Sequence, residues 1–114
     1  MAIQKFEEIL SWQKSKDLAI FVYKSFKDCR DFAFRDQLQR AIISISNNIA
    51  EGFERGGDKE LKYFLYVAKG SCGEVRSMSY IALELGYVNK EEFEQIYSST
   101  NEISRLLGGF IKKL

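Results

Sequence analysis

The chain has 114 residues, of which 46% are hydrophobic and 29% charged, a composition typical of one soluble globular domain spanning residues 1–114. Its 17 Lys and Arg residues nearly balance 16 Asp and Glu residues, so the net charge of +1 excludes a general electrostatic attraction to nucleic acid or membranes. Binding of either kind therefore requires a local patch of charge.

The residues needed for catalysis are missing. Histidine is absent, which removes the commonest general base and the commonest neutral metal ligand. No serine or cysteine is paired with another base, and residues 54–60 (ERGGDKE) lack the glycine spacing of a phosphate-binding loop. We therefore expect a protein that acts by binding, with no catalytic residues, no metal and no cofactor.

The location of the protein is predicted from three features. The N-terminal residues mix charges with apolar side chains, unlike a signal peptide. No apolar run approaches the roughly 20 residues that span a bilayer. Cys29 and Cys72 match no metal or redox spacing, so we expect two reduced thiols. These features predict a cytoplasmic protein with no membrane partner.

Helical periodicity, uninterrupted by any proline, predicts four helices. They cover residues 11–27, 34–54 and 58–85, and a fourth begins after Asn89, with Phe93, Ile96, Tyr97, Ile103, Leu107 and Phe110 on one face. Ser11, Asp58 and Asn89 are the predicted N-caps. Gly56 and Gly86 are suited to ending the second and third helices.

Short connections between long helices predict an all-α, up-down-up-down antiparallel four-helix bundle. A short N-terminal arm, residues 1–10, carries several apolar side chains, so we expect it to pack on the bundle. No strand alternation, linker or internal repeat is visible.

The third helix carries two apolar arcs. The first should face the core and comprises Leu61, Leu65, Ala68, Cys72, Val75 and Ala82. The second comprises Tyr63, Val67, Gly70 and Ile81, and together the arcs are wider than a four-helix core needs. The second arc either covers a seam of the bundle or forms a homo-oligomer interface. Gly70 favours the interface, because a small residue lets another helix approach closely.

A basic stripe is predicted on the other side of the third helix. Its members recur at steps of three, four and seven residues: Arg55, Lys59, Lys62, Tyr66, Lys69 and Arg76. The cations suit phosphates and the tyrosine suits a base, which makes this stripe, with help from Arg40, the candidate nucleic-acid site. The alternative is an ordinary solvated face, neutralised locally by Asp58 and Glu60.

The second helix carries a polar ridge formed by Arg40, Ser44, Asn47, Glu51 and Arg55, with Asn48 and Gly52 beside it. Neighbours three or four residues apart can pair, as Glu51 can with Arg55. Half-buried between protomers, Asn47, Asn48, Glu51 and Gly52 would determine the register of an oligomer, because unpaired buried polar groups are costly. A ligand or RNA site on the same ridge is the alternative.

Three segments carry a family resemblance: WQKSKDLAIFVY (12–23), LQRAIISISNNIAEGFERGGDKELKYFLYVAKGS (38–71) and LELGY (83–87). They resemble the bacterial proteins named for intervening sequences in large-subunit ribosomal RNA genes. These are related in fold to the accessory variability determinant proteins of diversity-generating retroelements. Ser46 and the stretch RDFAF (30–34) stand where the family usually has proline, which predicts a straighter second helix and a looser first connection.

The resemblance implies a ring-shaped homopentamer of four-helix protomers that binds RNA or DNA. The function expected here is that of a nucleic-acid-binding accessory protein. The alternative is a protein interaction scaffold without a nucleic-acid ligand, in which grooves between helices receive a partner helix.

Overall fold

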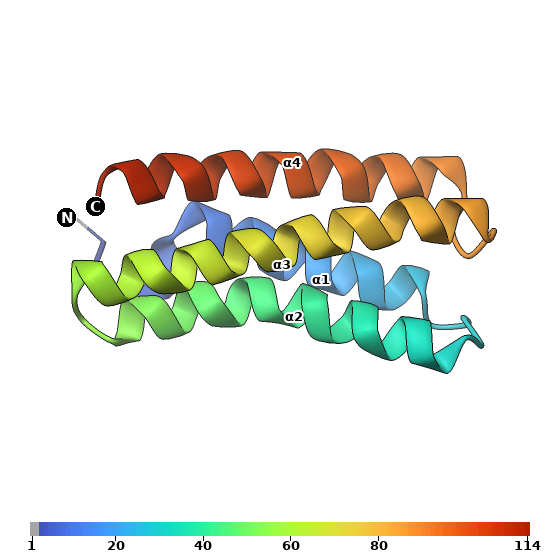
Figure 1. The fold of residues 1–114 in the computed structure, drawn as a ribbon, viewed down its shortest axis with the longest axis horizontal. Helices are drawn as coiled ribbons and strands as arrows, with labels where there is room; N and C mark the ends of the chain where they lie inside the picture. Colours follow the sequence, from blue (N-terminus) through green and yellow to red (C-terminus); the bar gives the residue numbers. More distant parts are fainter. Residues whose placement is uncertain (1–2) are drawn as a thin grey trace.

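The computed structural model describes residues 3–114, which form four α-helices, one short 3₁₀ helix and no strand. The elements are η1 (Phe6–Glu8), α1 (Leu10–Ser25), α2 (Phe32–Glu54), α3 (Asp58–Glu84) and α4 (Lys90–Lys112). Successive helices run antiparallel in a bundle of 43 × 22 × 19 Å (Figure 1). In the described range each helix packs against two neighbours, and in the diagonal pairs, α1 with α3 and α2 with α4, no two Cα atoms lie within 8 Å of each other. The predicted antiparallel four-helix bundle is confirmed.

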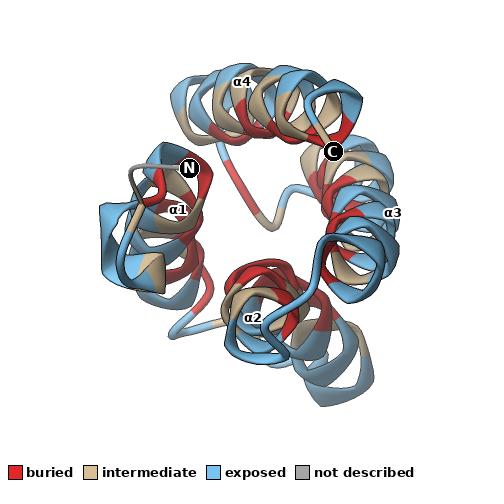
Figure 2. Cartoon of the chain, turned by 90° about the vertical axis from the view of Figure 1, so that its left-hand side faces the viewer, coloured by how far each residue is buried: buried red, intermediate tan, exposed pale blue. Residues whose placement is uncertain are grey.

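The core lies along the axis of this bundle, and Figure 2 shows that the buried residues of all four helices face inward. The core arc predicted on α3 is buried throughout. Ile96, Ile103 and Leu107 of α4 are buried as predicted, whereas Tyr97 is 41% exposed and does not belong to the core. The N-terminal arm packs on the bundle through Ile9 and through Phe6, whose ring meets Trp12 edge to face at 5.1 Å.

Several predicted helix ends are correct. Asn89 forms a capping box, in which its side chain accepts from the Glu92 N–H at 2.7 Å and its own N–H donates to Glu92 at 2.9 Å. Gly56 and Gly86 have φ angles of 88° and 76°, a left-handed conformation that glycine adopts without strain. These ends were predictable because capping depends on only a few neighbouring residues.

Two predicted N-caps are wrong. The N-cap of α1 is Ile9, so Ser11 lies inside the helix, where its Oγ is buried without a hydrogen-bond partner in the described residues. The N-cap of α3 is Gly57, and Asp58 is the first helical residue, where its carboxylate still favours the helix dipole. Both helices therefore begin without a side-chain cap.

α2 begins at Phe32 because Asp31, which the sequence analysis passed over, is its N-cap. The Asp31 carboxylate accepts from the Phe34 N–H at 3.2 Å and from the Tyr87 hydroxyl at 2.7 Å. The hydrogen bond from Tyr87, and to a lesser extent that from the Phe34 N–H, holds the pKa of the Asp31 carboxyl below its ordinary value. The same hydrogen bond to Asp31 raises the pKa of the Tyr87 hydroxyl. The connection between α1 and α2 is thus hydrogen-bonded to the connection between α3 and α4.

Among the described residues no helix is long and apolar enough to cross a membrane. The same residues contain no cluster of three or more His, Cys, Asp or Glu side chains placed to hold a metal ion.

Candidate nucleic-acid interface

The predicted basic stripe does not remain continuous in the structure, because Arg55 is not on α3. It is the C-cap of α2, and Gly56 and Gly57 separate it from the next helix. Its guanidinium lies 2.7 Å from the Glu51 carboxylate and 3.9 Å from that of Glu60. The hydrogen bond to Glu51 raises the pKa of Arg55. Two carboxylates therefore neutralise the charge that was assigned to phosphate binding.

Arg40 lies elsewhere on the bundle. It lines one groove between α1 and α2 and another between α2 and α3. Arg40 therefore lies beside Ser71 and Glu74, on the side of α3 that faces α2. Its predicted help to the third-helix stripe stays a prediction.

The other members of the stripe do share one side of α3. Lys59, Lys62, Tyr66 and Lys69 are exposed. Lys69 extends towards α4, and its Cε would lie 3.8 Å from a Cβ placed on Gly108. Arg76 is half-buried and donates from Nη1 to the Asn101 side chain of α4 at 2.7 Å. The C-terminal part of the stripe, Lys69 and Arg76, therefore borders α4 instead of facing directly away from the core.

α4 completes a groove that the sequence analysis did not identify. The groove has a volume of about 520 Å³ and is lined by Lys69, Asn101, Ser104, Arg105, Gly108, Gly109 and Lys112, and we call it the basic groove. No carboxylate lines it, and within residues 3–114 none of its three cations forms a salt bridge. The sequence signal from which this groove could have been predicted is the recurrence of polar, glycine and basic residues at steps of three and four along α4.

The chemistry of this groove suits a polyanion. Three uncompensated cations converge from two helices, and side-chain amide and hydroxyl groups lie between them, a combination used for phosphate and sugar contacts. Lys112 also lies in the last turn of α4, where the helix dipole favours a cation. Lys69 and Arg105 lie within their helices, so the dipole does not account for them.

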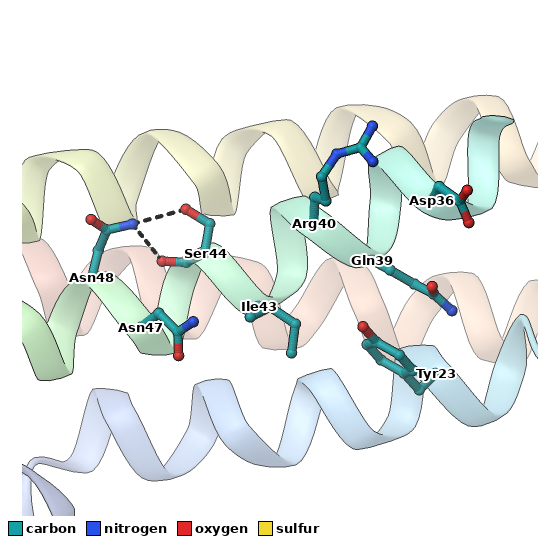
Figure 3. A pocket seen from close by; sticks show the side chains of 8 residues that line it. All are labelled: Tyr23, Asp36, Gln39, Arg40, Ile43, Ser44, Asn47 and Asn48. Atoms are coloured by element: carbon teal, nitrogen blue, oxygen red, sulfur yellow. Dashed lines mark hydrogen bonds between the residues drawn. The ribbon is translucent and has the colours of Figure 1, made fainter.

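Part of the polar ridge on α2 makes contacts inside the protomer, namely Ser44 together with the adjacent Asn48 and Gly52. Asn48 donates from Nδ2 to the Ser44 carbonyl at 2.7 Å and to the Ser44 hydroxyl at 2.8 Å (Figure 3). That hydroxyl lies 2.8 Å from the hydroxyl of Ser71 on α3. Gly52 is buried against α3, where an added Cβ would stand 2.7 Å from the Phe64 Cβ. These residues bring α2 and α3 together.

Asn47 is exposed, as are Arg40, Glu51 and Arg55 of the ridge. Asn47 and Ile43 extend from α2 towards α1, and Tyr23 extends from α1 towards α2 (Figure 3). These side chains line an open groove of about 620 Å³. The ridge therefore has one side facing α3 and one side open to solvent, and its predicted role in an oligomer stays a prediction.

Comparison with known proteins identifies the family. The model of the 23S rRNA-intervening sequence protein family matches residues 7–109. The chain belongs to this family. A crystal structure of a protein of unknown function from the S23 ribosomal protein family of Bacteroides thetaiotaomicron shares the fold, with a TM-score of 0.84 at 24% identity. The match covers 90% of this chain and 99% of that one. A search of curated proteins found no match.

This intervening-sequence family member also presents an apolar face on α3. Tyr63 is 63% exposed and Ile81 49% exposed, and Val67 is exposed beside them. Nothing lies within 4 Å of a Cβ placed on Gly70. These residues are exposed on the protomer, and the alternative that they cover a seam of the bundle also stays open. Their assignment to an oligomer interface stays a prediction.

Proposed function

We propose that this family member is an RNA- or DNA-binding accessory protein, in which the basic groove contacts the phosphate backbone. The observation that carries the proposal is the convergence of Lys69, Arg105 and Lys112 in a groove without a carboxylate, on a chain whose net charge is only +1. Three cations therefore gather on one seam of a nearly neutral chain. The family name refers to a sequence within 23S rRNA, which supports RNA as the first ligand to test.

The affinity of one protomer for a nucleic acid is expected to be modest, because three phosphate contacts contribute little at physiological salt. We propose that self-association through the apolar face of α3 repeats the basic groove around an assembly, such as the pentamer implied by the family resemblance. Linked copies of a weak site raise the overall affinity without any new contact.

The test is fluorescence anisotropy of a labelled structured RNA at about 50 and about 200 mM salt. Three phosphate contacts predict that affinity falls roughly 20- to 40-fold between these salt concentrations. The triple variant Lys69→Glu, Arg105→Glu, Lys112→Glu should lose binding.

A matched control changes the same amount of charge elsewhere on the bundle. Lys24, Lys27 and Arg30 are exposed, lie in or just after α1, and form no salt bridge in the described chain. Reversing these three charges should reduce affinity far less than reversing those of the basic groove. Equal losses in the two triple variants, or no binding at low salt, would refute the proposal.

A second candidate function is that of a protein interaction scaffold, and the exposed apolar face of α3 favours it. Both candidate functions invoke self-association through this face, so sedimentation velocity of the wild type should show an assembly, and the pair Val67→Glu and Ile81→Glu should dissociate it. The scaffold function is supported where that assembly forms and binds no RNA at low salt. Ile20→Glu on α1 is the control, because Ile20 is 48% exposed and nearly matches Ile81. A wild type that sediments as a monomer would exclude self-association through this face.

A further inference from the structure

A cluster of three aromatic rings lies on the same seam as the basic groove. Tyr80 comes from α3, and Phe93 and Tyr97 come from α4. The Phe93 ring centroid is 5.1 Å from that of Tyr80 and 5.9 Å from that of Tyr97, and the two tyrosine centroids are 6.2 Å apart. Phe93 is half-buried against the core and holds both tyrosine rings at the surface.

The cluster continues the basic groove along the same antiparallel register. Lys69 reaches Gly108, Arg76 bonds Asn101 about two turns further along α3, and Tyr80 meets Tyr97 one turn beyond Arg76. Eleven residues separate Lys69 from Tyr80, which places the cations and the rings about 17 Å apart along the helix. Cations and aromatic rings thus follow one line across two helices.

We propose that the α3–α4 seam binds a single-stranded nucleic acid, with its phosphates on the basic groove and an unpaired base on the Tyr80–Tyr97 rings. This inference rests on the proposed function and specifies its ligand. A cationic groove combined with exposed aromatic rings is the arrangement with which proteins bind single strands, because every base has a face that can stack. The rings cannot stack on the bases of a duplex, because those bases are already stacked on one another inside the double helix.

The exposure of the rings supports a binding role over a purely structural one. Tyr80 is 50% exposed and Tyr97 41% exposed, so much of each ring remains in water. The end of the core is already closed by Phe93 and by Val88, which is buried. Phe93 also fixes the positions of the rings before a ligand binds, which lowers the entropic cost of stacking.

The experiment compares two labelled probes, an oligouridylate of about 12 nucleotides and an RNA duplex of similar length, at about 50 mM salt. The wild type should bind the oligouridylate more tightly. The double variant Tyr80→Leu, Tyr97→Leu should bind the single strand at least about fivefold more weakly, because one stacked base contributes a factor of roughly 5 to 150. Its affinity for the duplex should not change, which also shows that the variant is folded.

Two controls isolate the contribution of the rings. Tyr80→Phe with Tyr97→Phe keeps both rings and should retain single-strand binding. Tyr23→Leu removes a ring of similar exposure from α1 and should have no effect. The charge-reversal triple variant of the basic groove should lose both probes.

The failure of this inference can be distinguished from failure of the proposed function. A wild type that binds neither probe refutes both. Equal affinity for the two probes, or a Leu double variant that binds the oligouridylate as the wild type does, refutes the stacking site and leaves the basic groove intact. An oligodeoxythymidylate of the same length then shows whether the strand must be RNA.

Discussion

Gly52→Ala and Gly70→Ala should change stability in opposite directions, although each replaces a glycine within a helix. In a helix interior alanine is favoured over glycine by about 0.8–1.0 kcal/mol, and this gain is common to both variants. At Gly70 the new Cβ would have no atom within 4 Å. At Gly52 it would stand 2.7 Å from the Phe64 Cβ and 3.4 Å from the Leu61 Cα. Both of these atoms are fixed to the backbone of α3, so the two helices must move apart.

Overpacking of this kind typically costs about 1–3 kcal/mol. Because the gain in helix propensity cancels between the variants, Gly52→Ala should be less stable than Gly70→Ala by about the same 1–3 kcal/mol. Urea unfolding followed by far-ultraviolet circular dichroism measures the difference. Both variants are compared at one protein concentration, with their assembly states determined by sedimentation velocity, because an oligomer interface adds to apparent stability. Equal stability, or greater stability for Gly52→Ala, would refute the close approach of α2 and α3.

Three further predictions concern other residues. Glu51→Ala removes the exposed ion pair between Glu51 and Arg55 and should lower the free energy of unfolding by no more than about 0.5 kcal/mol. A larger loss of stability would reveal a partner of Glu51 outside the protomer. Because the folded-state pKa of Asp31 is lowered, its hydrogen bonds stabilise the fold above the unfolded pKa of about 3.9, and this contribution disappears as the pH falls through the folded pKa. Tyr87→Phe should thus unfold more easily than the wild type near neutral pH, and denaturant titrations should converge in acid; a difference independent of pH would contradict this. Burial raises the pKa of the Cys72 thiol to about 11. A thiol reagent at about pH 8 should therefore modify half-buried Cys29 and leave Cys72 intact. Equal modification rates at the two cysteines would count against the packed core.

The helices, the core arc of α3 and the capping box at Asn89 were predictable from the sequence. Each depends on residues close together in the chain: a period of 3.6 residues identifies the buried face, and a cap requires only four consecutive positions. The wrong prediction of Ser11 as the N-cap of α1 also comes from relying on neighbouring residues alone. A serine directly before Trp12, the first apolar residue of a helical pattern, looks like a cap locally, but the 3₁₀ turn at Phe6–Glu8 places Ile9 at the N-cap position.

The candidate binding surface depended on tertiary structure. Along the chain Arg55 continues the spacing of Lys59 and Lys62, yet two glycines place it on another helix, beside two carboxylates. Lys69 and Arg105 are 36 positions apart, and no local pattern relates them. The sequence by itself determined which residues form each helix and which face of it is buried. Packing alone decided which polar and basic side chains meet across a seam, because that depends on the neighbour of each helix and on their relative register.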